Sequence, residues 1–206
     1  VVMCADNGVV EEGVSSAPQS VTMAQTVNFT RRLTGVGALA QSFGSVLLIV
    51  DLGVKDPIPD ELYDNVPLRD THKIVNRRVR PGTCNIAREP AMTKDEVIRC
   101  IMTGIEMADA VKDAGFDIAG VGEMGIGNTT TSAAVLSALT GLDSSETCGR
   151  GGGVNDAGFI RKKEIVDAVS EKYRTPDQEK NLDSLEDIRH TVLDILADMG
   201  GFDICA

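Results

Sequence analysis

Short, continuous apolar runs alternate along the chain with longer runs in which apolar residues recur every three or four positions. The short runs are typical of strands covered on both faces, and they occupy residues 1–5, 45–54, 116–121 and 202–206. The longer runs predict helices over about residues 21–43, 93–115, 130–139, 159–173 and 184–200. Residues 73–79 predict a short or edge strand. Strands that alternate with such helices indicate an α/β fold, a three-layer, Rossmann-like parallel sheet flanked by helices.

Capping residues mark the ends of two of these helices. Gly44 suits the C-terminus of the helix over 21–43, because glycine readily adopts the left-handed backbone conformation found there. Thr93 and Glu96 form a capping box at the start of the helix over 93–115. These signals support the helical interpretation of both runs.

Two polar stretches interrupt the regular pattern. Residues 55–73 are rich in proline and acidic residues and are expected to form an exposed loop, and residues 174–183 a surface loop. The chain shows no internal repeat, so residues 1–206 are expected to form a single α/β nucleotide-binding domain. Both ends of the chain lie inside strand-like runs, and we therefore expect a fragment of a longer protein with a sheet incomplete at both ends.

Composition excludes some classes of function. The net charge is −11, aromatic residues make up 3% of the chain and tryptophan is absent. A general nucleic-acid binder needs a basic face or aromatic stacking surfaces. The negative net charge and the low aromatic content therefore both argue against nucleic-acid binding. A small anionic ligand remains compatible with this charge, because backbone N–H groups and one or two cations can hold a phosphate in an acidic protein.

The cysteines and histidines give no sign of a metal or disulfide framework. His72 and His190 lie far apart, and the cysteines are scattered and odd in number, without a C-x-x-C pair: Cys4, Cys84, Cys100, Cys148 and Cys205. We expect small buried thiols in a reducing cytoplasm and no metal site. No run is apolar and long enough to span a membrane, and no signal peptide is evident.

The segment 122–130 (GEMGIGNTT) carries the strongest chemical signal. Gly125 and Gly127 permit a tight turn and the close approach of a ligand to the backbone. Asn128 and Thr129 open the next helix, whose free N–H groups and dipole favour an anion. The segment lacks the spacing of a Walker A loop and of the dinucleotide fingerprint. The alternative is a tight turn with no ligand.

A second glycine-rich loop, residues 149–153, precedes a helix that carries Lys162. One interpretation is a surface connection followed by solvated basic residues. The other is that the loop backbone and a lysine complete the anion site. In the second case Glu123, at the end of the preceding strand, presents a carboxylate to the same crevice.

The segment 122–134 (GEMGIGNTTTSAA) closely resembles the signature of the nicotinate-nucleotide–dimethylbenzimidazole phosphoribosyltransferase family, which builds the lower nucleotide loop of cobalamin. Further segments match that family in order: 5–9 (ADNGV), 18–28 with Val21, Thr22 and Gln25, 50–54 (VDLGV), 82–86 (GTCNI), 89–93 (EPAMT) and 200–203 (GGFD). The resemblance extends from end to end of the chain.

The resemblance implies a glycosyltransferase that moves the phosphoribosyl group of nicotinate mononucleotide onto 5,6-dimethylbenzimidazole, with α-ribazole 5′-phosphate and nicotinate as products. It implies no cofactor, a cytoplasmic location, a homodimer for the full-length protein, and no binding to nucleic acid or membranes. Glu123 would be a supporting carboxylate near the reacting groups. The substrate-binding residues would be Gln25, Met124, Gly125, Ile126, Gly127, Asn128, Thr129, Gly151, Gly152 and Lys162, of which Gln25 and Met124 would line the benzimidazole slot.

The chain departs from the family pattern in two respects. Asn7 stands where the family usually has histidine, so no role is carried over to that position. The family's general base is a glutamate in a Gly-Glu-Gly-type segment that these 206 residues do not contain, and we expect the isolated chain to be nearly inactive. The family's N-terminal helical portion is missing as well.

Two further functions fit the same pattern. A noncatalytic module that holds a phosphorylated nucleotide or an azole base would keep the glycine-rich cradle and need no base. A scaffold whose glycine loops are only turns would bind no anion where the helix after Gly127 begins.

Overall fold

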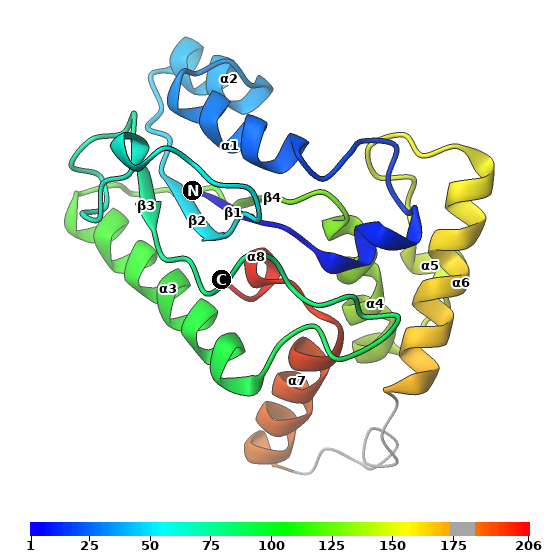
Figure 1. Cartoon of the computed structure of the whole chain (residues 1–206). Coiled ribbons are helices and arrows are strands. Elements are labelled where there is room, and N and C mark those ends of the chain that lie inside the picture. Colours follow the sequence, from blue (N-terminus) through cyan, green and yellow to red (C-terminus); the bar gives the residue numbers. More distant parts are fainter. Residues whose placement is uncertain (174–183) are drawn as a thin grey trace.

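Four parallel strands form the centre of the molecule. We describe residues 1–173 and 184–206 of a computed structural model (Figure 1). The strand order is β3-β2-β1-β4, with β1 (Val2–Ala5), β2 (Ile49–Gly53), β3 (Ile74–Asn76) and β4 (Gly122–Met124). Val2 pairs with Ile49 on one side and with Gly122 on the other, while Ile49 pairs with Ile74. The predicted parallel sheet is confirmed.

Eight α-helices and two short 3-10 helices connect and flank the strands in the described part of the chain. The α-helices are α1 (Val21–Thr30), α2 (Gly35–Phe43), α3 (Lys94–Asp113), α4 (Asn128–Thr140), α5 (Ser144–Thr147), α6 (Asp156–Lys172), α7 (Leu185–Met199) and α8 (Phe202–Cys205). The 3-10 helices are η1 (Gly8–Glu12) and η2 (Asp60–Leu62).

The two faces of the sheet are buried by different helices, because successive side chains of a strand point to opposite sides. Val2 and Cys4 of β1 belong to an apolar cluster with Phe29 of α1. Met3 and Ala5 belong to the larger cluster, built with side chains of α3, α4, α6, α7 and α8. Figure 1 accordingly shows α1 and α2 on one side of the sheet and α3 and α7 on the other. The expected three layers are present.

The helix predicted over 21–43 is two helices. The chain turns between α1 and α2, where Arg32 adopts a positive φ of 60°. Thr34 then caps α2, its hydroxyl accepting a hydrogen bond from the Gly37 amide at 3.0 Å. A threonine that competes for backbone donors favours a new helix start over a continued helix. As predicted, α2 ends at Gly44, with φ of 65°.

The strand predicted over 116–121 is wrong, because these residues have no regular structure and the strand begins at Gly122. Ile118 and Val121 are each 89% exposed. The register explains the shift: β1 pairs with β4 from Val2 onward, so only residues from Gly122 onward have a partner. An apolar run gives no information on where pairing starts.

The strand predicted over 202–206 is also wrong, since Phe202–Cys205 forms the short helix α8. Gly200 and Gly201 end α7, and the Cys205 amide then donates to the Gly201 carbonyl at 3.0 Å. Phe202 is fully buried. A short apolar run bounded by glycines fits a buried helical turn as well as a strand, and periodicity does not separate the two.

The remaining predictions agree with the structure within a few residues. The capping box of Thr93 and Glu96 is present at the start of α3. α4 and α6 begin two or three residues earlier than predicted, at Asn128 and Asp156. The exposed loop predicted over 55–73 holds only in part, because the segment also contains η2 and the buried Ile58. The loop predicted over 174–183 lies outside the described residues.

Candidate anion site at the carboxyl ends of β1 and β4

The strand order places a switch point between β1 and β4. The chain builds β1, β2 and β3 outward in one direction and then returns to add β4 on the other side of β1. Loops diverge at such a point, and ligands of open parallel sheets bind in the crevice outside the carboxyl ends of the strands. Asp6 and Asn7 follow β1 there, and Gly125 follows β4.

The glycine turn after β4 lies directly against the end of β1. A Cβ atom on Gly125 would overlap the Ala5 carbonyl oxygen and lie 2.8 Å from Asn7 Nδ2. Gly127 has a φ of 93°, a conformation that side chains disfavour. Both glycines are therefore required by the backbone path, which brings the start of α4 over the sheet edge.

The start of α4 is open to a ligand. Gly127 occupies the N-cap position, and no side chain caps this end of the helix. The Asn128 and Thr130 amides are used in the turn, donating to the carbonyls of Gly125 and Gly127 at 3.0 and 2.9 Å. The helix dipole and the other N–H groups of the first turn favour a negatively charged group at this point.

A buried lysine lies beside the same helix turn. Lys162 of α6 is 1% exposed, and its Nζ donates to Thr129 Oγ1 at 2.8 Å and to the Gly149 carbonyl at 2.9 Å. Desolvation lowers the pKa of this ammonium group. Lys162 thus joins the two glycine-rich segments, with one bond to α4 and one to the loop over 149–153.

The second glycine-rich loop packs against the first turn of α4. A Cβ atom on Gly151 would lie 2.6 Å from Thr129 Oγ1, and the Gly152 carbonyl accepts a hydrogen bond from Ser16 Oγ at 3.4 Å. A cavity of about 90 Å³ lies where these segments meet, and it is lined by residues 14–17 and 125–129 together with Arg150, Gly152 and Val154. The cavity is of a size for a small anionic group rather than for a whole nucleotide.

Glu123 lies in β4, one strand residue before Met124. Its Oε1 accepts a hydrogen bond from Ser132 Oγ of α4 at 3.4 Å. Although the residue as a whole is exposed, desolvation of the carboxyl group raises its pKa, and the hydrogen bond from Ser132 opposes this shift. A carboxylate with a raised pKa near an anion site is suited to exchange a proton.

The predicted base-slot residues lie on the α1 side of the sheet. Met124 packs onto the apolar cluster of that face together with Met23. Gln25 is half-buried on α1, one turn after Thr22, whose Oγ1 accepts a hydrogen bond from the Ile126 amide at 3.0 Å. The start of α1 is therefore fastened to the glycine turn. The structure brings the other predicted site residues together around α4, while Gln25 and Met124 belong to this second side.

No role was assigned from the sequence to three buried residues of the site: Asn7, Thr131 and Asp203. Asn7 Oδ1 accepts a hydrogen bond from Thr131 Oγ1 at 3.2 Å, and Asn7 Nδ2 donates to Asp203 Oδ2 at 3.4 Å. The signal that could have found Asp203 is the segment 200–203, which matches the family pattern and carries an acid inside an apolar run.

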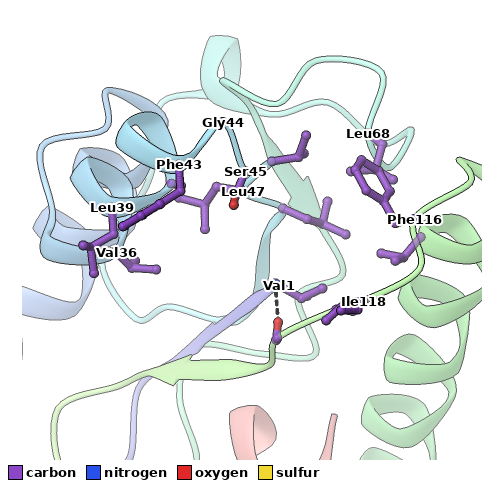
Figure 2. Close-up of a pocket in the computed structure, with 16 residues that line it drawn as sticks. Val1, Val36, Leu39, Phe43, Gly44, Ser45, Leu47, Leu68, Phe116 and Ile118 are labelled. Carbon is purple, nitrogen blue, oxygen red and sulfur yellow. Dashed lines mark hydrogen bonds between the residues drawn. The ribbon is translucent and has the colours of Figure 1, made fainter.

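A larger apolar groove of about 600 Å³ lies elsewhere, at the amino ends of β1 and β2 (Figure 2). Phe43 and Leu39 of α2 face Phe116 and Ile118 across it, with Val1 at its base. None of the side chains that line it is ionisable. The groove has apolar surface but no side chain that could bind an anion or transfer a proton. The candidate site is therefore the smaller cavity at the opposite end of the strands.

The described part of the chain offers neither a metal site nor a membrane-spanning helix. Within residues 1–173 and 184–206, no group of three histidine, cysteine or acidic side chains is arranged to hold a metal ion. No helix in these ranges has both the length and the apolar character needed to cross a membrane.

Comparison with known proteins gives one consistent result. A family model described as phosphoribosyltransferase matches residues 1–206. The nicotinate-nucleotide–dimethylbenzimidazole phosphoribosyltransferase of Clostridium perfringens (strain ATCC 13124) is 45% identical over 206 residues, which are 100% of this chain and 51% of that protein. The enzyme of the same name from Clostridium tetani is 40% identical over 204 residues, covering 99% of this chain and 50% of its own length.

Two solved structures from Thermus thermophilus have the same fold. CobT superimposes with a TM-score of 0.83 at 34% identity, covering 99% of this chain and 54% of that chain. The second, a nicotinate-nucleotide-dimethylbenzimidazole phosphoribosyltransferase, gives a TM-score of 0.80 at 32% identity, covering 99% of this chain and 53% of its own. The chain spans about half the length of the curated relatives it matches.

Proposed function

The chain belongs to the phosphoribosyltransferase family, and we propose that it supplies the phosphoribosyl-binding part of an enzyme that transfers this group from nicotinate mononucleotide to 5,6-dimethylbenzimidazole. The products would be α-ribazole 5′-phosphate and nicotinate, the former a precursor of the lower loop of cobalamin. The observation that carries the proposal is the position of Lys162, buried between the glycine turn at α4 and the loop over 149–153.

Two features of the site support phosphoribosyl binding, namely backbone donors and a cation. A phosphate needs backbone donors and a cation, and the uncapped start of α4 provides the donors while Lys162 provides the charge. Gly125, Gly127 and Gly151 let the two glycine-rich segments pack closely against the rest of the chain, since a Cβ atom at each would meet another residue. We place the phosphate in the cavity lined by Asn128, Arg150 and Gly152.

The reaction also needs a slot for the benzimidazole base and a group that stabilises the positive charge developing on the sugar. In our proposal Gln25 and Met124 line the base side, and Glu123 faces the reacting groups from β4. A carboxylate there stabilises positive charge that develops on the sugar as nicotinate leaves. The principal general base, which the family resemblance places outside these residues, is not assigned to Glu123.

The proposal includes a cytoplasmic location, in keeping with five cysteines that are all free. A homodimer for the full-length protein, the absence of nucleic-acid and membrane binding, and low turnover by the 206 residues alone remain predictions. The alternative of a noncatalytic nucleotide-binding module uses the same cradle, so the decisive experiment measures selectivity.

Calorimetric titration with nicotinate mononucleotide, α-ribazole 5′-phosphate and adenosine monophosphate tests the proposal. We expect tighter binding of the first two ligands than of the third. Equal binding of all three would indicate a general nucleotide-binding module, and binding of none would indicate that the glycine loops are only turns. A turnover assay with nicotinate mononucleotide and 5,6-dimethylbenzimidazole, with a full-length relative as reference, then measures how much activity the chain has.

A further inference from the structure

Asp203 places a buried carboxyl group directly under the glycine turn. The residue is 4% exposed and lies at the start of α8. Its Oδ1 accepts a hydrogen bond from the Ile204 amide at 3.1 Å, and its Oδ2 accepts one from Asn7 Nδ2 at 3.4 Å. None of the ion pairs in the described part of the chain includes Asp203. Buried acids usually have a cationic partner, so this arrangement needs an explanation.

Asn7 connects this acid to the first turn of α4. Asn7 is fully buried, and its Oδ1 accepts from Thr131 Oγ1 at 3.2 Å. Thr131 Oγ1 also lies 2.8 Å from the Asn128 carbonyl. A continuous set of polar contacts therefore runs from α8 through the end of β1 to the helix start at which an anion would bind.

The same two side chains form the surface on which the glycine turn rests. A Cβ atom on Gly125 would lie 2.6 Å from Asp203 Oδ2 and 2.8 Å from Asn7 Nδ2, and one on Gly127 would lie 3.4 Å from Asn7 Cβ. Contacts this close fix the position of the turn relative to β1. A shift of either side chain would move the backbone donors of the cradle.

We propose that Asp203 and Asn7 are positioning residues that hold the Gly125–Asn128 turn in place for an anion, and that Asp203 does so in its protonated form. This inference rests on the proposed function for the identity of the anion, the phosphate of the phosphoribosyl group. The fixing of the turn itself does not depend on that identity.

The ionisable groups around Asp203 keep its proton in place. Those that interact with it are Glu123 of β4 and the thiols of Cys4, Cys100 and Cys205, and none of them is cationic. Burial first, and the charge of Glu123 second, raise the pKa of Asp203 to about 8. Below that pH the carboxyl group is neutral and does not repel a bound phosphate. Above it, a negative charge forms in a region of low dielectric under the cradle.

Two variants and one control test the proposal. Asp203→Asn keeps the shape and the acceptor for Asn7 without the ability to ionise, while Asp203→Ala removes the contact. Asp51→Asn is the matched control, because Asp51 is another fully buried acid, but it bonds to Tyr63 and to the Gly53 and Val54 amides of β2 and the residue after it. The measurements are the Kd for nicotinate mononucleotide between pH 7 and 9.5 and the hydrogen exchange of the Asn128 and Thr130 amides.

In the unaltered protein we expect the affinity for nicotinate mononucleotide to fall by about tenfold from pH 7 to pH 9.5. The reason is that the ionised Asp203 carboxylate repels the phosphate, and a tenfold loss corresponds to about 1.4 kcal/mol. Asp203→Asn should remove the part of this fall that Asp203 causes and leave only the part that follows from deprotonation of Lys162, whose pKa desolvation lowers. Asp51→Asn should keep the whole fall. Asp203→Ala should weaken binding by about tenfold at pH 7 and accelerate exchange at both amides.

The inference is overturned if Asp203→Asn retains the whole pH dependence, or if exchange in Asp203→Ala matches that of the unaltered protein. If Asp203→Ala does not fold, the Asn variant alone decides through its pH profile. If the unaltered protein binds no nicotinate mononucleotide at any pH while Asp203→Ala accelerates exchange, the proposed function fails and the positioning of the turn by Asp203 is supported.

Discussion

Lys162 Nζ donates a hydrogen bond to Thr129 Oγ1 at 2.8 Å, and this contact joins two segments that are 33 residues apart in the chain. The lysine is almost fully buried, although burial of an ammonium group is costly without compensation. Its remaining observed partner is a carbonyl, Gly149, rather than a carboxylate. A buried cation held by two neutral oxygens has unused capacity to bind an anion.

Lys162→Met should therefore reduce affinity for nicotinate mononucleotide. Methionine has a similar length and fills the site without a charge. Loss of a charge-assisted hydrogen bond costs about 1.5–3 kcal/mol, which corresponds to about a 10- to 150-fold increase in Kd. Calorimetric titration gives the Kd directly.

Lys163→Met is the matched control for this change. Lys163 is the next residue of α6, but its Nζ lies 5.0 Å from the centre of the Phe159 ring. Removing this charge should change Kd by no more than about twofold, because charges in contact with solvent are screened. Equal losses in both variants would show that overall charge, and not the contact with Thr129, governs binding.

Gly125→Ala should strongly destabilise the protein. The added methyl group would overlap the Ala5 carbonyl oxygen and lie 2.6 Å from Asp203 Oδ2. Backbone atoms of a central strand cannot move aside, so we expect the free energy of unfolding to fall by about 3 kcal/mol. Urea denaturation measures this. Gly120→Ala, at an exposed position with no atom within 4 Å of the new methyl group, should have nearly unaltered stability, and a similar loss in both variants would contradict the assignment.

The sequence predicted the sheet and its helices well where elements were long or carried their own capping residues. Thr93 and Glu96 fixed the start of α3, and the glycine turn fixed the start of α4 to within two residues. The errors at 116–121 and 202–206 have one cause. Short apolar runs show that a segment is suited to burial, whereas pairing register and helical closure depend on residues far away in the chain.

The candidate site shows the same division. The anion-binding turn could be predicted from Gly125 and Gly127 alone, because a positive φ and close packing against other backbone both require glycine. The contact of Asn7 with Asp203 spans 196 positions and has no local pattern. The pattern of apolar and polar residues does not indicate which turn a buried acid contacts. The contact between Asp203 and Asn7 is therefore visible only in the folded chain.

The apolar groove at the amino ends of the strands gives a prediction about stability. Phe43 of α2 is 79% exposed, whereas Phe29 of α1 is 6% exposed in the cluster between the helices and the sheet. Phe43→Ala should change the free energy of unfolding by no more than about 0.5 kcal/mol, and Phe29→Ala should lower it by about 3–5 kcal/mol. Urea denaturation of the two variants distinguishes these outcomes, and a large loss for Phe43→Ala would show that the groove is filled in solution.

The buried carboxyl group of Asp203 should make stability depend on pH in an unusual direction. Its pKa is raised in the folded protein from 3.8 to about 8 because of burial and the nearby Glu123. Below pH 3.8 the group is protonated in both the folded and the unfolded state. Between pH 3.8 and 8 the unfolded chain ionises while the folded protein keeps its proton, so each rise in pH favours unfolding.

The stability of the unaltered protein should consequently fall relative to that of Asp203→Asn over this range, by at most about 1.4 kcal/mol per pH unit, and the difference should level off above pH 8. Asp143→Asn is a control of opposite sign. Hydrogen bonds from Ser145 lower the pKa of Asp143 in the folded protein, so the difference between this variant and the unaltered protein should stay constant above about pH 5. Urea denaturation at intervals from about pH 4 to 9 measures both differences. A constant difference for Asp203→Asn would mean that Asp203 is already ionised in the folded protein, with a cation or bound water compensating its charge.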